Sequence, residues 1–201
     1  MRIYLTYISF LLLLACGNAS SPSAQSFPND STIISQELDA PIIPIADGFD
    51  FPVGPPDAKQ YYNAQPFGKN SHLGDDWNGV GGGNSDLGDP VYSIAHGLVV
   101  EAEDHGSGWG KVIRIVHQLD SGGKQVESLY AHLDTMMIEE GELIERGDPI
   151  AKIGNADGAY WAHLHLEIRA KVGLPLGGGY GDDTADYLDP TVFIEEHRPK
   201  Q

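Results

Sequence analysis

Three short segments of this chain carry histidine and aspartate side chains at spacings that suit a metal ion. They read His-Leu-Gly-Asp-Asp at 72–76, Tyr-Ala-His-Leu at 130–133 and His-Leu-His at 163–165. Imidazole nitrogens and carboxylate oxygens are zinc ligands, and three of them around one ion leave a fourth position open for water. Convergence of three such side chains on one point therefore predicts a catalytic zinc site.

The spacing within each segment indicates which side chains can face that point. Successive side chains of a strand alternate between its two faces, so His163 and His165 share a face. His72 and Asp76 are also an even number of residues apart. Gly74 between them disfavours a helix and favours extended or turning backbone. Because the segments are remote in sequence, the site requires a fold that joins them.

The elements that must position these side chains are expected to be short strands. From about residue 60 onward, β-branched runs alternate with connections rich in Gly, Asp and Ser. We expect strands at 91–103, 111–117, 125–133, 149–154 and 163–169. The pattern indicates neither a long helix nor a repeat. It predicts a mainly β (β-rich α+β) fold. The length of 201 residues suggests one domain plus tails.

Two of these expected strands have one apolar face and one histidine-bearing face. In 163–169, leucine and isoleucine alternate with His163 and His165, and in 125–133 leucine and alanine alternate with Tyr130 and His132. This pattern predicts an antiparallel sheet that packs on one face and lines a groove with the other. Tyr130, on the expected His132 face, is then a candidate for a hydrogen bond to substrate.

The charge balance limits the possible partners. Lys and Arg number 12 against 29 Asp and Glu, which gives a net charge of −17. A surface this acidic repels phosphate backbones, and no basic stripe interrupts it, so we expect no nucleic-acid partner. An anionic polymer remains a possible substrate only through local contacts, because the global field does not attract it.

The N-terminal segment is typical of a secreted protein. Residues 1–15 contain Arg2 and an apolar run of signal-peptide length, too short for a comfortable transmembrane helix. The run ends in Leu-Leu-Ala-Cys-Gly, which looks like a bacterial lipobox with Cys16 as the lipidated residue. A plain secretory signal cut near Ala19 or Ala24 is the alternative. Acylation explains why a secreted chain carries one cysteine without a partner.

The composition then divides the rest of the chain in two. Residues 16–40 are rich in Ser, Asn, Pro and Ala without sustained periodicity, which predicts a flexible tether. Residues 41–201 carry the strand pattern and all three motifs. We therefore expect a signal peptide at 1–15, a tether at 16–40 and one catalytic domain at 41–201.

Taken together, the motifs resemble the lysostaphin-like, or LytM-type, zinc endopeptidases of bacterial cell walls. The resemblance extends from about Asn63 to Phe193 and includes further positions besides the histidine motifs. These are Gly88-Asp89-Pro90-Val91, Gly97-x-Val99, Gly110, Gly147, Gly154, Leu166-Glu167 and Tyr187-Leu188-Asp189-Pro190. The segment 155–162 is longer and more aromatic than the small-residue turn usual in that family.

The resemblance implies a LytM-type peptidase domain with a duplicated-hybrid-motif-like fold. It implies that His72, Asp76 and His165 hold Zn²⁺, and that His132 and His163 flank the attacking water without binding the metal. One flanking imidazole would accept the proton of the water and the other would donate to the developing oxyanion, in an order that the sequence leaves open.

The implied function is hydrolysis of peptide stems or cross-links in peptidoglycan. The protein would act in the bacterial cell envelope, anchored to a membrane through Cys16. The bond that is cut, a D-alanyl link or a glycine bridge, stays open.

The sequence can be compared with three other functions. A catalytically inactive LytM-like module would bind cell wall or activate a separate hydrolase, but such modules typically lack metal ligands, and none is missing here. A lipoyl- or biotinyl-type carrier has a strand–turn–strand pattern similar to residues 88–103, yet no lysine stands at a hairpin tip with the flanking pattern that such carriers need. A related zinc carboxypeptidase would need a Glu-x-x-His motif, which does not occur.

For several other side chains the sequence allows either a role at the site or a purely structural role. Asp75 is expected to be a neighbour of the site, and His117 either to lie near it or to serve the core. The aromatic residues either wall a peptide groove or simply pack, with packing the more common role. They are Trp77, Trp109, Tyr160 and Trp161.

Overall fold

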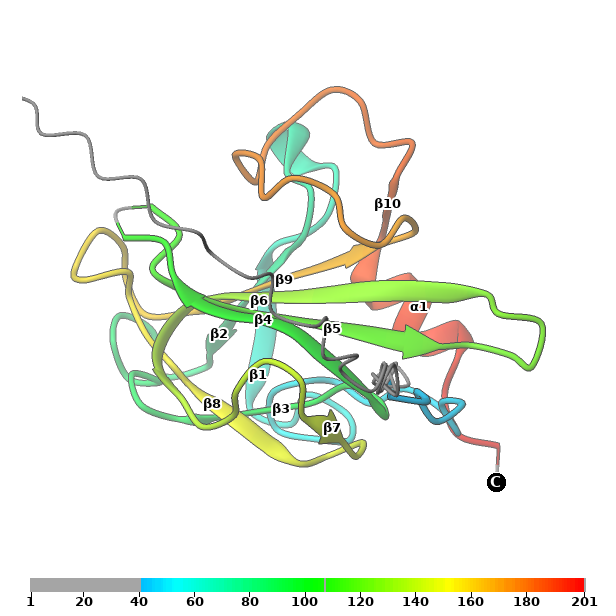
Figure 1. Ribbon diagram of the computed structural model, residues 1–201. Coiled ribbons are helices and arrows are strands. Elements are labelled where there is room, and N and C mark those ends of the chain that lie inside the picture. Colours follow the sequence, from blue (N-terminus) through cyan, green and yellow to red (C-terminus); the bar gives the residue numbers. More distant parts are fainter. Residues whose placement is uncertain (1–40, 107, 201) are drawn as a thin grey trace, which may run out of the picture. The chain divides into compact units, whose positions relative to one another are not determined.

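A computed structural model describes residues 41–106 and 108–200. Within them, ten strands form one sheet in the order β1-β2-β9-β6-β5-β4-β7, with β10 on β9 and β3 joined through β8 to β6 (Figure 1). The strands are β1 Tyr61–Gln65, β2 Asp75–Gly79, β3 Pro90–Tyr92, β4 Gly97–Asp104, β5 Lys111–Gln118, β6 Gln125–Met136, β7 Leu143–Ile144, β8 Pro149–Ile153, β9 Leu164–Arg169 and β10 Tyr187–Leu188. The pairings between these strands are antiparallel, so the predicted mainly β, antiparallel fold is confirmed.

Two short helices complete the described elements: the 3-10 turn η1 (Lys69–Ser71) and the α-helix α1 (Pro190–Glu196). Asp189 caps α1 by accepting a hydrogen bond from the backbone N–H of Val192, and Pro190 occupies the first turn, where a missing N–H costs nothing. No helix of the described part is both long and apolar enough to cross a membrane.

Strand β6 is the centre of the sheet, and its partners change along its length. One edge pairs with β5 over 125–133. The other edge pairs first with β9, over 127–131, and then with β8, over 133–136. His132 lies where these two partners separate, and it has a positive φ of 62°. Ile113 and Lys111 of β5 pair with Tyr130 and Leu133 of β6. Between these paired positions β6 has one residue more than β5, which makes a β-bulge.

The bulge changes the face to which side chains of β6 point. Tyr130 and Leu133 pack in the main hydrophobic core, whereas Ala131 packs in a smaller cluster on the other face. His132 faces this second side, with its ring near Trp109. The expectation that Tyr130 shares a face with His132 is therefore wrong, because the extra residue breaks the strict alternation on which it rested.

Strand β9 follows the alternation predicted from its sequence. Its leucine and isoleucine side chains lie in the main core, and His165, Glu167 and Arg169 are buried on the opposite face. The connection that follows β9, orange in Figure 1, folds back over this face. Arg169 donates hydrogen bonds to the backbone of this connection, including one of 3.0 Å to the carbonyl of Leu176. The second face of the sheet is thus partly covered.

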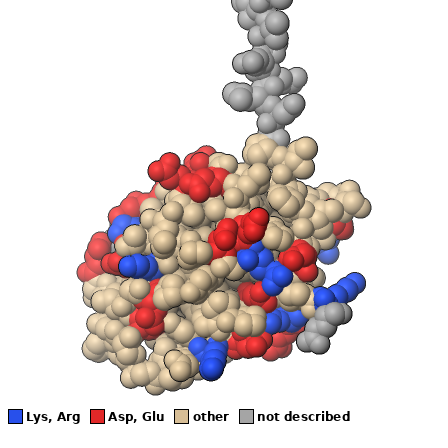
Figure 2. Space-filling model, turned by 90° about the horizontal axis from the view of Figure 1, so that it is seen from below, with Lys and Arg blue, Asp and Glu red and all other residues tan. Residues whose placement is uncertain are grey.

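The surface carries the negative charge expected from the composition. On the face that Figure 2 shows, Lys and Arg side chains of the described residues are scattered among Asp and Glu and form no continuous basic patch. Arg146, for example, pairs with both Asp47 and Asp50. A polyanion approaching this face would meet acidic groups among the basic ones.

Candidate metal centre and groove

The pairing of β2 with β9 brings two of the candidate ligands together. In this antiparallel pair Asp76 lies directly opposite His165, so their side chains point to the same face. Gly74 just before β2 permits the close approach, because a Cβ at that position would lie 2.4 Å from the carbonyl oxygen of Leu166. His72 joins them from the segment before β2, where it bridges to Tyr180.

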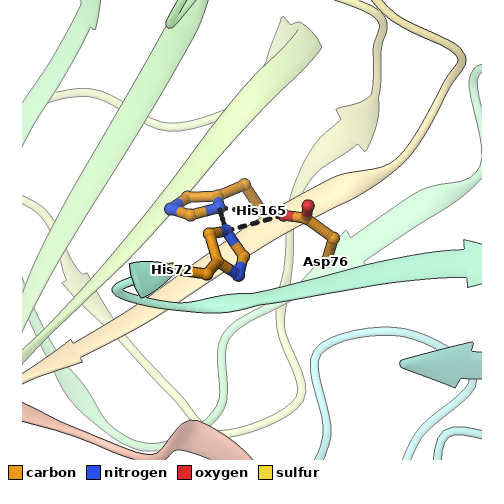
Figure 3. A group of neighbouring side chains, drawn as sticks. All are labelled: His72, Asp76 and His165. Atoms are coloured by element: carbon orange, nitrogen blue, oxygen red, sulfur yellow. Dashed lines mark hydrogen bonds and ion pairs between the residues drawn. The ribbon is translucent and has the colours of Figure 1, made fainter. Parts of the chain in front are cut away.

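His72, Asp76 and His165 converge on one point, as Figure 3 shows. Nε2 of His72 lies 3.1 Å from Nδ1 of His165 and 3.3 Å from Oδ1 of Asp76, and the third side of this triangle is 2.9 Å. Tetrahedral zinc with bonds of about 2.0–2.1 Å separates neighbouring ligand atoms by roughly 3.3 Å. The three atoms therefore fit one face of a zinc tetrahedron.

The outer nitrogen of each imidazole already has a partner. Nδ1 of His72 donates to the carbonyl oxygen of Gln65 over 3.0 Å, and Nε2 of His165 lies 3.1 Å from a carboxylate oxygen of Glu167. Because these oxygens accept, the outer nitrogens carry the protons. Metal-binding histidines in proteins are held in this way, with the second nitrogen fixed by a carbonyl or carboxylate.

The electrostatics of the three residues favour a bound cation. Burial alone would raise the pKa of Asp76, but hydrogen bonds from His165 and His72 outweigh it and hold that pKa well below its usual range. For His165 burial acts in the other direction and alone would lower the pKa, yet hydrogen bonds to Asp76 and Glu167 raise it to about 9. A proton between the triangle's atoms thus occupies the place where a metal ion would bind.

His132 and His163 flank the triangle. Their ring centroids are 4.8 Å apart, and Nε2 of His163 is 3.8 Å from Oδ1 of Asp76. Nδ1 of His132 donates to the carbonyl of Trp109 over 3.2 Å, and Nδ1 of His163 donates to the carbonyl of Trp161 over 2.8 Å. In the neutral form of each ring, Nε2 is therefore the unprotonated nitrogen.

The two flanking histidines are positioned by backbone contacts between loops. Gly154, after β8, bridges to His163, and a Cβ on Gly154 would lie 2.4 Å from the carbonyl oxygen of His132. Burial, reinforced by the charges of His165 and His163, lowers the pKa of His132 to about 3. His132 is therefore neutral near pH 7 and able to accept a proton.

A groove of about 1020 Å³ lies over these five residues. Four aromatic side chains line it: Tyr160 and Trp161, which are 46% and 70% exposed, and Trp109 and Tyr180. Side-chain amides also line it, namely Gln65, Asn78, Asn84 and Asn155. Amides donate and accept hydrogen bonds, so the lining suits an extended peptide backbone.

The remaining candidates take structural roles. Tyr130 is fully buried, and its hydroxyl accepts a hydrogen bond from the N–H of Ile94, so it cannot contact a substrate in the groove. His117 is also fully buried, between the carbonyl of His96 and the hydroxyl of Ser128. Trp77 packs in the core. Asp75 accepts hydrogen bonds from Thr191 and Phe67, which ties α1 and the segment before η1 to β2.

Some groove residues were not singled out from the sequence. Gln65, Asn78, Asn84 and Tyr180 reach the groove only through pairing of remote segments. Asn84 accepts a hydrogen bond from the N–H of Ala162 and Asn78 donates to its carbonyl, which fixes the segment before His163. Glu167, by contrast, lies within the quoted motif and carried a signal through its spacing of two from His165.

Comparison with known proteins places this geometry in a family. A lipoprotein of Yersinia enterocolitica named NlpD is 38% identical to this chain over 84 residues, which cover 42% of this chain and 80% of the relative. The murein hydrolase activator NlpD of Escherichia coli K12 is 37% identical over 84 residues, which cover 42% of this chain and 21% of the relative. Peptidoglycan DD-endopeptidase ShyB of Vibrio cholerae is 32% identical over 82 residues, 41% of this chain and 18% of the relative.

The last two relatives are therefore much longer than the part that this chain matches. Among solved structures, a zinc containing peptidase from Vibrio cholerae aligns with a TM-score of 0.50 and 26% identity, over 64% of this chain and 41% of the other. The model of Peptidase family M23 matches residues 76–177, just over half of the 201 residues. The chain belongs to peptidase family M23.

Proposed function

We propose that this protein is a zinc-dependent endopeptidase that hydrolyses peptide cross-links of bacterial peptidoglycan. The observation that carries the proposal is the convergence of His72, Asp76 and His165 at the floor of a groove flanked by His132 and His163. The family assignment and the likeness to a zinc containing peptidase support zinc and peptide hydrolysis. The name of the ShyB relative supports peptidoglycan as the substrate.

Each residue of the centre has a chemical task in this reaction. The Nε2 atom of His72, the Nδ1 atom of His165 and the carboxylate of Asp76 would hold the ion. When bound there, Zn²⁺ would lower the pKa of water towards about 7 and polarise the scissile carbonyl. The two flanking histidines handle the protons, because Nε2 of each ring faces the groove while Nδ1 is tied to a backbone carbonyl.

The proton transfers follow from these ring orientations. One neutral imidazole accepts the proton of the attacking water at Nε2 and delivers it to the leaving amine. The other, when protonated, donates from Nε2 to the oxyanion that develops on the carbonyl. Burial keeps the ring of His132 neutral at pH 7, with Nε2 as its unprotonated nitrogen.

The groove would bind and orient the substrate. Trp161 and Tyr160 offer exposed aromatic faces on one side, and the amides of Asn78 and Gln65 offer hydrogen bonds to a peptide backbone. Holding a peptide between these side chains places its carbonyl over the metal triangle and removes water from the reacting bond. Positioning of this kind supplies a large part of a rate enhancement.

The test combines metal analysis with the identification of products. Purified protein is expected to contain one zinc per chain and to release peptides with a new amine and a new carboxyl terminus from peptidoglycan, as identified by mass spectrometry. Removing zinc with a chelator should stop the release, and adding zinc back should restore it. His165→Ala should lose both zinc and activity, whereas His105→Ala, which alters an exposed histidine, should keep both. Undiminished cleavage by the zinc-free protein would refute the proposal.

A second candidate function is activation of a separate murein hydrolase. It is favoured by one observation, the 37% identity to a relative named a murein hydrolase activator. The intact ligand triangle argues for catalysis instead, because activation through binding alone does not require a metal ion. Peptidoglycan treated with this protein alone separates the two: an activator leaves it uncut and acts only when a second hydrolase is added.

We also propose that the domain of residues 41–201 is held at a membrane. Residues 1–15 would be the signal peptide, Cys16 the lipidated residue and 16–40 the tether; these lie outside the described residues, and the proposal rests on their sequence and on the lipoprotein name of the Yersinia enterocolitica relative. A flexible tether of this length reaches roughly 25–30 Å. Labelling with a radioactive fatty acid should mark the protein, and Cys16→Ser should abolish the label.

A further inference from the structure

A row of alternating charges runs across the second face of the sheet and ends at the metal triangle. Its members lie on neighbouring strands β4, β5, β6 and β9. In order they are Glu101, Arg114, Glu127, Arg169, Glu167 and His165, with separations of 3.0, 2.8, 3.6, 2.7 and 3.1 Å between successive charged groups. Glu127, Glu167 and Arg169 are fully buried. We call this row the charge ladder.

Among the carboxylates of the charge ladder, Glu167 contacts a candidate metal ligand, His165. One of its carboxylate oxygens lies 3.1 Å from Nε2 of His165, and the other accepts a hydrogen bond of 2.7 Å from Nε of Arg169. Because β9 is a strand, His165, Glu167 and Arg169 stand at intervals of two on the same face. The carboxylate therefore bridges the imidazole and the guanidinium.

Arg169 has little freedom to move away from Glu167. It donates hydrogen bonds to the backbone carbonyls of Leu174, Pro175 and Leu176 in the connection that covers this face. A fully buried guanidinium also has no water to replace a lost partner, so breaking the pair would be costly. The position of Glu167 is thus determined by the fold rather than by the metal site.

The orientation of the His165 ring depends on this fixed carboxylate. A ring that donates from Nε2 to Glu167 must present Nδ1 on its other side, towards His72 and Asp76. Without the acceptor, Nε2 would be a buried donor with no partner, and rotation of the ring or a change of tautomer would remove the metal-binding nitrogen from the triangle.

We propose that Glu167 is a positioning residue, which is locked by Arg169 and aims Nδ1 of His165 at the zinc ion. The rest of the charge ladder, including Glu127, stabilises the sheet and its covering connection but does not act on the metal. This inference rests on the proposed zinc function, and it assigns a role to a side chain that touches neither metal nor substrate.

A matched pair of variants tests the assignment. Glu167→Gln and Glu127→Gln both neutralise a fully buried carboxylate that contacts an arginine of the charge ladder. Only the first contacts His165. Zinc affinity is measured in the full chain by competition with a chromophoric chelator. Glu167→Gln should bind zinc about 10–100-fold more weakly than the wild type, the loss typical of outer partners of ligand histidines. Glu127→Gln should bind zinc like the wild type.

A double variant protects the test against misfolding. Replacing Glu167 and Arg169 together by Met removes the buried pair without leaving an unpaired charge, an exchange that is often neutral for stability. It should retain the circular dichroism spectrum of the wild type and still bind zinc weakly. Wild-type affinity in a folded Glu167 variant, or equal losses in both single variants, would overturn the inference while leaving the zinc site in place. Absence of zinc binding by the wild type would instead remove the proposed function itself.

Discussion

The backbone carbonyl of Trp161 accepts a hydrogen bond of 2.8 Å from Nδ1 of His163, two residues further along the chain. The carbonyl of Trp109 holds His132 in the same way from a different loop. Both imidazoles therefore present Nε2 to the groove, although one belongs to a bulge in β6 and the other precedes β9. Local backbone thus determines which nitrogen of each ring can take part in a proton transfer.

This arrangement predicts that the two flanking histidines act on turnover and not on the metal. His132→Ala and His163→Ala should each lower kcat by about 10²–10⁴, the usual contribution of a general acid or base. Zinc content should stay at the wild-type value, because neither ring belongs to the ligand triangle. The measurements are peptide release from peptidoglycan and metal analysis of the same preparations. Full activity in both variants would remove them from the mechanism.

Zinc binding is predicted to release a proton. Contacts with Asp76 and Glu167 raise the pKa of His165 to about 9, so this ring is protonated at pH 7 in the metal-free protein, and zinc must displace the proton from Nδ1. The affinity should therefore rise with pH up to about 9 and fall in acid. Calorimetric titration with zinc in two buffers of different ionisation enthalpy gives the number of protons released. A heat that is independent of the buffer would contradict this prediction.

Acid sensitivity is predicted from His117. Burial lowers the pKa of this ring to about 4, although the hydrogen bond to the carbonyl of His96 acts in the opposite direction. Between about pH 6.5 and pH 4 the unfolded chain binds a proton here that the folded one does not, so stability falls as the pH falls, by at most about 3 kcal/mol. The free energy of unfolding of the metal-free protein should lose part of this slope in His117→Asn. His105→Asn, at an exposed site, is the control.

The exposed ring of Trp161 is predicted to contribute to substrate binding. Trp161→Ala should raise KM for a peptidoglycan peptide several-fold and leave zinc content unchanged, because only the indole is removed and the carbonyl that holds His163 remains. Tyr62→Ala removes another exposed aromatic ring, which does not line the groove, and it should leave KM unaltered. An equal change of KM in both variants would argue against the indole as part of the binding surface.

Tyr130 is predicted to act on stability and not on substrate. Tyr130→Phe leaves the N–H of Ile94 without its acceptor in the core, which should cost about 1–3 kcal/mol of unfolding free energy. KM should not change, because the hydroxyl is buried away from the groove. Denaturant unfolding and steady-state kinetics on one preparation give both quantities. Unaltered stability combined with a raised KM would restore the role in substrate binding that the sequence pattern predicted.

The sequence predicted those parts of the centre that depend on local periodicity. His165 and the leucines of β9 follow strict alternation, because β9 is a regular strand between two antiparallel neighbours. The pairing of His72 and Asp76 with this strand was expected from their even spacing and from the family resemblance. The register that places Asp76 opposite His165 follows from non-local pairing and could not be derived from either segment alone.

Prediction from side-chain alternation failed in β6, which pairs with three other strands, β5, β8 and β9. His132 adopts a left-handed backbone conformation at the bulge, so Tyr130 and His132 point to different faces. Nothing in the residue types of 125–133 indicates an extra residue there. The groove walls were missed for a similar reason: Gln65 and Tyr180 meet through a hydrogen bond of 3.0 Å between segments 115 residues apart.

The separation of β8 from β9 along one edge of β6 has a consequence for how this architecture can diversify. The link between those two strands, residues 154–163, carries Tyr160 and Trp161, while the ligand triangle depends on η1, β2 and β9. Lengthening or exchanging the middle of that link would change the shape of one wall of the groove and leave the metal geometry intact. Selectivity and reactivity are thus encoded in different stretches of the polypeptide, and related chains can vary the first without rebuilding the second.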